Sequence, residues 1–248
     1  LFLALTFLLG IFPLKDADFH WHLRTGDLIR KTGQVPRVDF YTFTCQGKPW
    51  IDLHWIFQVG ISWINQQKKL GVPWFATVST ATVHTPMQVP PVNTLPADAE
   101  DANGVDPESV PGRLLIANQM IQAMDSEFGR LLVSTGLAKK VGSKLVLTAA
   151  SANTTVIYVN DNGSLGSQVR EPFDPERAKG TPYQTGVWTP MVVAGASVFT
   201  PGKDVNAMVN IADLYELIGN IGGVDVRAGN PRTIDSVPMA PYFVNPNL

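Results

Sequence analysis

An apolar stretch that ends in hard oxygen donors is where this sequence could do chemistry. Residues 154–159 are β-branched or aromatic, which predicts a buried strand. The stretch ends in Asn160-Asp161-Asn162-Gly163, a cluster typical of turns. Carboxylate and carboxamide oxygens are ligands that Ca²⁺ or Mg²⁺ accepts, and open α/β sheets bind ligands beyond the carboxyl ends of their strands. Because Asp-Asn-Gly also makes an ordinary hairpin turn, these residues alone leave both interpretations open.

A second polar motif follows a loop. It comprises Lys179-Gly180-Thr181, then Gly186-Val187, Pro190 and an apolar run that ends in Ala194-Gly195. With the Asp-Asn-Gly turn, this order resembles the sulfatase family of the alkaline-phosphatase superfamily. The resemblance implies that Asp161 and Asn162 are ligands of a Ca²⁺ or Mg²⁺ ion and that Lys179 contacts the sulfate ester. A lysine suits that role because its ammonium is a compact point charge.

A histidine upstream continues the resemblance. Residues 74–79 predict a strand, which leads to Val83-His84-Thr85-Pro86. In sulfatases a strand ends at a His-x-Pro segment, and the histidine reaches the sulfate or the leaving-group oxygen. The resemblance therefore implies a catalytic role for His84. Without it, a lone histidine before a proline-rich loop would be assigned no chemistry.

The elements that must position these residues form an α/β domain over residues 73–248. We expect a partial alkaline-phosphatase/sulfatase-like sheet with flanking helices and strands at 74–79, 144–149, 154–159 and 190–195. A helix is predicted over 114–132, because apolar residues recur there at spacings of three and four. Its predicted core face consists of Leu114, Ala117, Ile121, Met124, Phe128 and Leu131. Residues 164–178 are expected to form a surface loop over the site.

The first 72 residues predict something different, a mainly helical and membrane-associated segment. Residues 1–14 carry no charge and are too few to cross a bilayer unaided, so we expect part of a membrane helix. The residues that follow, with Asp16, Asp18 and Trp21-His22-Leu23, resemble the first outer loop of bacterial GT-C type membrane glycosyltransferases. That resemblance implies that Asp16 or Asp18 serves as base or metal ligand for a lipid-linked sugar. Helix capping by the same aspartates is the structural alternative.

Composition limits which partners and covalent cross-links the chain can have. The chain has 248 residues, with 45% hydrophobic and 16% charged, and a net charge of −2. We expect no nucleic-acid partner, because no basic patch is present. Its single cysteine, Cys45, excludes an intramolecular disulfide. A membrane-associated, periplasmic or other extracytoplasmic location is expected.

The nucleophile of the family is missing from this sequence. Sulfatases carry a Cys-x-Pro-x-Arg segment whose cysteine is oxidised to formylglycine, and the residues after Cys45 lack the proline and the arginine. We therefore expect a sulfatase-like hydrolase fragment, inactive alone, for a sulfate or phosphate ester of a small molecule or glycan. The alternatives are a phosphodiesterase of the same superfamily, a glycosyltransferase fragment, and a non-catalytic fused remnant.

Overall fold

The computed structural model describes residues 31, 52–84, 87–228 and 230–248, with side chains of its first long helix from residue 56 onward. Contacts divide the chain into two units, Leu1–Trp55 and Ile56–Leu248. Asp16, Asp18, Cys45 and the apolar segment 1–14 lie outside the described residues, so the predictions for them stay predictions. No helix within the described part of the chain is long and apolar enough to cross a membrane.

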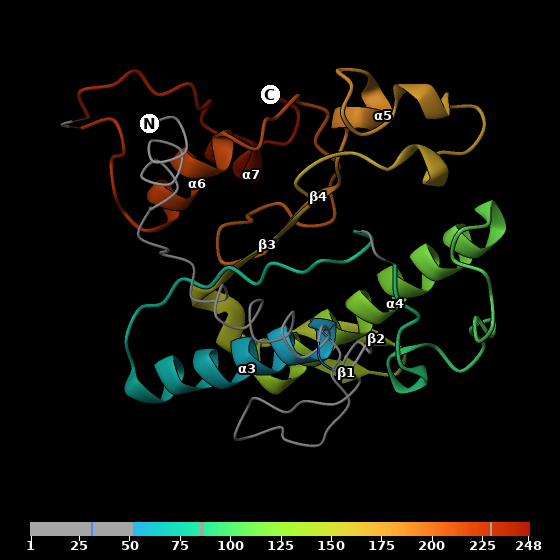
Figure 1. Cartoon of the computed structure of the whole chain (residues 1–248). Coiled ribbons are helices and arrows are strands. Elements are labelled where there is room, and N and C mark those ends of the chain that lie inside the picture. The colour runs from blue at the N-terminus through green and yellow to red at the C-terminus, as the bar shows by residue number, and fades with distance from the viewer. Residues whose placement is uncertain (1–30, 32–51, 85–86, 229) are drawn as a thin grey trace, which may run out of the picture. The chain divides into compact units, whose positions relative to one another are not determined.

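The described elements mix helices with short strands (Figure 1). In chain order they are α3 (Asp52–Leu70), η1 (Val92–Thr94), α4 (Val110–Ser134), β1 (Ala138–Val141), β2 (Lys144–Leu147), η2 (Ala149–Asn153), β3 (Thr155–Val159), η3 (Gly166–Gln168), η4 (Pro175–Arg177), α5 (Gln184–Val187), β4 (Met191–Gly195), α6 (Asp213–Ile221) and α7 (Ala240–Val244). The η elements are short 3₁₀ helices. The predicted α/β class is confirmed at this coarse level.

Helix α4 confirms the predicted helix over 114–132 and extends it at both ends. Ser109 caps its start, because the side-chain oxygen accepts a hydrogen bond from the Gly112 amide at 3.1 Å. The predicted apolar face is partly wrong, since Ile121 is 47% exposed. The most buried positions of the helix instead include two polar ones, Gln119 and Glu127. The amide of Gln119 donates to the carbonyl of Glu100, and Glu127 pairs with Arg130 at 2.5 Å.

Helix α3 lies within the segment expected to be mainly helical, residues 1–72, and packs on α4. Its apolar face buries Phe57, Ile61 and Ile64. Arg130 of α4 donates to the side-chain oxygen of Gln58 at 2.9 Å, and the side-chain amide of Asn65 donates to the carbonyl of Ser134 at 3.2 Å. Residues 56–70 therefore share a core with the α/β part, although the sequence favoured a boundary after residue 72.

The strands form two separate antiparallel pairs, so the single larger sheet that we expected is absent from the described residues. Strands β3 and β4 confirm the strands predicted at 154–159 and 190–195, and their register pairs Thr155 with Gly195 and Val159 with Met191 (Figure 1). The strand predicted at 144–149 is shorter and belongs to the β1–β2 hairpin. The strand predicted at 74–79 is wrong. Burial alternates along that segment, but it forms no ladder.

The C-terminal segment is fastened by one buried aspartate. Asp213, at the start of α6, accepts a hydrogen bond from the amide of Asn210 at 2.7 Å and another from the amide of Val237 at 2.8 Å. The buried carboxylate of Asp213 therefore ties the start of α6 to residue 237. The tail after α6 contains the short helix α7.

Candidate functional site

The site predicted from the sequence lies where β3 ends. The β-branched and aromatic residues of β3 pair with β4, and the chain then turns at Asp161 and Asn162. The side chain of Asp161 is exposed, whereas the side-chain oxygen of Asn162 is buried and has no hydrogen-bond partner among the described residues. A buried polar atom without a partner is costly, so this oxygen is suited to a ligand.

The turn is fastened to the segment that precedes β4. The amide of Gly163 donates to the carbonyl of Gly186 at 2.9 Å, and the amide of Ser164 donates to the carbonyl of Thr185 at 3.1 Å. A Cβ atom on Gly163 would lie 2.1 Å from the carbonyl oxygen of Thr185. Glycine therefore allows an approach of two backbones that no other residue permits.

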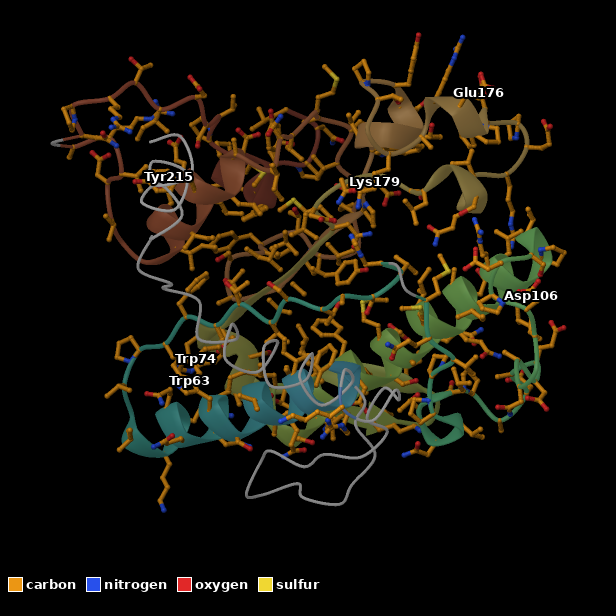
Figure 2. The ribbon with its side chains drawn as sticks, in the orientation of Figure 1. Trp63, Trp74, Asp106, Glu176, Lys179 and Tyr215 are labelled. Atoms are coloured by element: carbon orange, nitrogen blue, oxygen red, sulfur yellow. The ribbon has the colours of Figure 1, made fainter. Side chains whose placement is uncertain are left out.

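The Lys-Gly-Thr motif is hydrogen-bonded to the same turn. The amide of Lys179 donates to the carbonyl of Ser164 at 2.8 Å, which brings the lysine backbone next to the Asn162 turn. Thr181 closes a local turn, since its hydroxyl donates to the carbonyl of Ala178 at 2.7 Å. The Lys179 side chain is exposed, in a turn between η4 and α5 (Figure 2). Backbone hydrogen bonds thus join the segment that carries Lys179 to the turn that follows Asp161 and Asn162. We call residues 160–190 the site loop.

Gly186 is a residue of the site loop that the sequence interpretation gave no role. It is buried in α5, and a Cβ there would lie 2.3 Å from the carbonyl oxygen of Thr181 and 2.6 Å from that of Ala178. The turn that carries Lys179 consequently packs directly on α5. A glycine within a Thr-Gly-Val helical turn was the available signal, because glycine is unfavourable inside helices unless packing requires it.

The central part of the site loop is more ordered than a plain surface loop. It contains η3 and η4, and η3 contacts α4. Asp174 caps η4 by accepting from the amide of Glu176 at 2.9 Å, and it lies 3.5 Å from Arg177. The Arg177 guanidinium stacks over the ring of Tyr183, 4.6 Å from its centroid.

His84 is carried by a different segment, a tight turn. Its amide donates to the carbonyl of Ala81 at 2.9 Å, and its side chain is exposed. The preceding residue, Val83, has φ of 60°, a conformation that a β-branched side chain adopts at a cost. The hydroxyl of Thr82 is buried without a hydrogen-bond partner in the described ranges. The catalytic role expected for His84 stays a prediction.

The buried side of β3 has an electrostatic feature of its own. The ring of Tyr158 lies 6.2 Å from that of Phe128 on α4. Burial raises the pKa of the Tyr158 phenol above its ordinary value, and the nearby carboxylate of Asp125 raises it further. The phenol thus stays protonated to higher pH in the folded protein than in the unfolded chain.

The polar groups of the turn fit a hard cation in part. Asp161 offers an exposed carboxylate and Asn162 a buried oxygen without a partner, both of the oxygen type that Ca²⁺ and Mg²⁺ prefer. Two donors are fewer than the roughly six to eight that Ca²⁺ takes. Over the residues that the structure describes, no group of three or more His, Cys, Asp or Glu side chains is placed to hold a metal ion.

Comparison with known proteins points to one class of enzyme, the sulfatases. The chain is 24% identical over 182 residues to a sulfatase of Formosa agariphila, an alignment that covers 73% of this chain and 31% of that protein. It is also 25% identical over 108 residues to arylsulfatase K of Xenopus laevis, covering 44% of this chain and 18% of the relative. No protein-family model matches the chain.

These similarities support a sulfatase-like character for the C-terminal part of the chain. The chain spans less than a third of the length of either relative. The activity of the whole relatives is therefore considered below only as a proposal.

Proposed function

We propose that residues 73–248, with the packed helix α3, carry the sulfate-binding and cation-binding part of a sulfatase-type ester hydrolase. The observation that supports this most is the buried, unpartnered oxygen of Asn162 in a turn hydrogen-bonded to the segment that carries Lys179. A carboxylate, a carboxamide and an ammonium on one loop suit a cation and the tetrahedral anion that binds to it.

Lys179 is the proposed contact to the sulfate ester. Its backbone is fixed by the hydrogen bond to Ser164 while its ammonium is exposed, so the charge is available to an oxyanion. The ammonium would bind the ester. It would also stabilise the negative charge that grows on the ester oxygens in the transition state. His84 is proposed to reach the leaving-group oxygen and to give it a proton.

Asp161 and Asn162 are the proposed protein ligands of a Ca²⁺ or Mg²⁺ ion. When bound, such an ion supplies Lewis-acid polarisation of the ester oxygens. Asp161 would neutralise part of its charge, and Asn162 would satisfy its buried oxygen without adding a second negative charge. A site of this kind fits a phosphate ester as well as a sulfate ester, which keeps a phosphodiesterase of the same superfamily as the second candidate.

We assign the role of the formylglycine nucleophile to none of these 248 residues. We expect no turnover of an aryl sulfate by this chain alone, and measurable hydrolysis would contradict that expectation. The glycosyltransferase alternative depends on Asp16 and Asp18, outside the described residues, whereas both relatives reported above are sulfatases. An extracytoplasmic location is proposed on the same resemblance.

Calcium titration of the purified chain tests the cation site. We expect Ca²⁺ to raise the melting temperature, because a ligand that binds only the folded state stabilises it. Asp161→Asn should weaken Ca²⁺ binding by at least about tenfold, since even outer-shell substitutions have effects of that size. Asp204→Asn is the matched control, an exposed aspartate in another segment. Equal Ca²⁺ affinity in wild type and Asp161→Asn would refute the assignment.

A further inference from the structure

We propose that the β1–β2 hairpin docks this protein on an anionic lipid bilayer, through the face of the hairpin that points away from α4. The proposal goes beyond the hydrolase function and uses none of its residues. We call the four residues of this face, Lys139, Val141, Lys144 and Val146, the hairpin face. All four are exposed, and the two valines are 53% and 44% exposed.

The strand register places the hairpin face on one side of the hairpin. In this register each lysine of the face lies directly opposite a valine, and opposite residues project from the same side of a strand pair. The other side lies against α4, because a side-chain carbon of Leu145 is 3.3 Å from the position of a Cβ on Gly129. Ala138, which shares that side, is buried. The hairpin face is therefore left to solvent.

A tight turn and a closed base fix the hairpin. Gly142 has φ of 61° and begins the two-residue loop between the strands, where a type II′ turn requires glycine. At the base, the amide of Thr148 donates to the carbonyl of Leu137 at 3.0 Å. A surface fixed in this way loses little conformational entropy when it binds.

Two further lysines add positive charge at the base of the hairpin. Lys68, in the last turn of α3, donates to the carbonyl of Thr135, and its Nζ is 3.7 Å from the position of a Cβ on Gly136. Lys139 follows soon after, within about 11 Å of Gly136 even along a fully extended chain. Lys69 is exposed beside Lys68. Because these lysines come from two distant segments, the sequence alone shows no basic patch.

No acidic residue offsets this charge within the two segments. Residues 53–97 and 131–160 contain five lysines and neither aspartate nor glutamate. The whole chain has a net charge of −2, so its acidic residues are concentrated elsewhere. An anionic bilayer attracts such a cluster, and each lysine close to its surface tightens binding by about fivefold.

The valines favour a bilayer over a soluble polyanion. A soluble polyanion would pair with the ammonium groups and leave the valines in water. At a bilayer, apolar side chains enter the boundary between headgroups and acyl chains, and lysine stems lie along them while the ammonium groups reach the phosphates. The hairpin face offers both contacts. Leu70 and Val72, which follow Lys69 closely and are 63% and 44% exposed, repeat the combination.

Flotation of the full chain with vesicles tests the role of the lysines. The vesicles contain phosphatidylcholine with or without phosphatidylglycerol, and we expect phosphatidylglycerol to tighten binding in a salt-sensitive way. Residues 1–14 carry no charge, so any binding through them would not depend on phosphatidylglycerol. The double variant Lys139→Ala, Lys144→Ala should weaken binding by about 25-fold. Lys203→Ala, at an exposed lysine outside both segments, is the matched control and should bind like the wild type.

Val141→Ser tests the apolar contact. It should weaken binding to the phosphatidylglycerol vesicles by about fivefold, because the bilayer no longer covers an apolar side chain. Val237→Ser is the matched control, since Val237 is 56% exposed in another segment. Binding of polyphosphate, a soluble polyanion, should be the same in Val141→Ser and wild type.

Three results would overturn the proposal. They are equal binding to the two kinds of vesicle, wild-type binding by the double alanine variant, and wild-type vesicle binding by Val141→Ser. If the last result comes with polyphosphate binding that needs Lys139 and Lys144, the surface binds soluble polyanions and not a bilayer. The double variant Lys139→Arg, Lys144→Arg keeps the charge and should bind like the wild type, which separates loss of charge from loss of fold.

Discussion

The backbone amide of Gly163 donates to the carbonyl of Gly186 at 2.9 Å, and this bond joins the turn after β3 to α5. A loop separates the two glycines in the sequence. At each of them a Cβ atom would overlap a backbone oxygen. Together with the hydrogen bond from the Lys179 amide to the carbonyl of Ser164, the bond between the glycines joins the segments that carry Asn162 and Lys179. The close approach also explains why residues 163 and 186 are both glycines.

Gly186→Ala is expected to destabilise the protein. Its Cβ would lie 2.3 Å from the carbonyl oxygen of Thr181, and overpacking of this kind costs about 1–3 kcal/mol. Urea denaturation measures the free energy of unfolding. Gly222→Ala is the control, because a Cβ there meets its nearest neighbours at 3.4 Å, an ordinary contact. Equal stability of the two variants would show that the close approach at Gly186 is not tight.

Val83→Asn is expected to stabilise the turn before His84. Valine at φ of 60° is strained, whereas asparagine tolerates the left-handed region, and relief is worth roughly 1 kcal/mol. Thermal denaturation of the variant should show a higher melting temperature. Val89→Asn, at an exposed valine without positive φ, should show no such gain. A lower melting temperature for Val83→Asn would argue against strain at this position.

Asp213→Ala is expected to weaken the C-terminal segment. Asp213 is buried and accepts hydrogen bonds from the amides of Asn210 and Val237. The substitution removes both bonds, and a hydrogen bond to a charged group contributes about 1.5–3 kcal/mol. Chemical denaturation measures this cost. Asp235→Ala, at an exposed aspartate of the same segment, should change little. Similar losses for both variants would contradict the tie between α6 and residue 237.

The Tyr158 phenol should make stability depend on alkaline pH. Burial raises its pKa in the folded state, so the folded protein holds this proton longer than the unfolded chain. The contribution is fully present below the ordinary pKa of about 10 and is lost as pH rises through the folded-state pKa. Urea midpoints across this range should fall less steeply for Tyr158→Phe than for wild type. Tyr215→Phe is the control, and an unchanged slope in Tyr158→Phe would contradict the assignment.

Local patterns predicted the elements whose stability is decided locally. The run of β-branched residues in β3 and the apolar spacing in α3 and α4 fix secondary structure without knowledge of partners. Segment 74–79 failed because a strand also needs a ladder partner, and its alternating burial is satisfied without one. A period of two in the sequence therefore predicted the burial and not the hydrogen bonding.

The buried face of α4 shows why polar core positions escape prediction. Ile121 was expected inside and is exposed, whereas Gln119 and Glu127 are buried. The partners that make this burial tolerable are the carbonyl of Glu100 and the guanidinium of Arg130. The contact with Glu100 joins residues that are distant in the sequence. The spacing of apolar residues predicts neither this contact nor the one with Arg130.

For the site, the sequence indicated Asp161, Asn162 and Lys179, and the structure joins their segments. The sequence interpretation gave Gly186 no role of its own, because the close approach at this glycine depends on which backbones meet after folding. The catalytic role of His84 beside these residues stays a prediction.

Sulfate titration with and without Ca²⁺ is the most direct test of the account. A cation on Asp161 and Asn162 beside Lys179 predicts that Ca²⁺ tightens sulfate binding and, by linkage, that sulfate tightens Ca²⁺ binding. Lys179→Ala should abolish sulfate binding, whereas Lys144→Ala, at an exposed lysine of β2, should preserve it. Sulfate binding that ignores both Ca²⁺ and the loss of Lys179 would contradict the account.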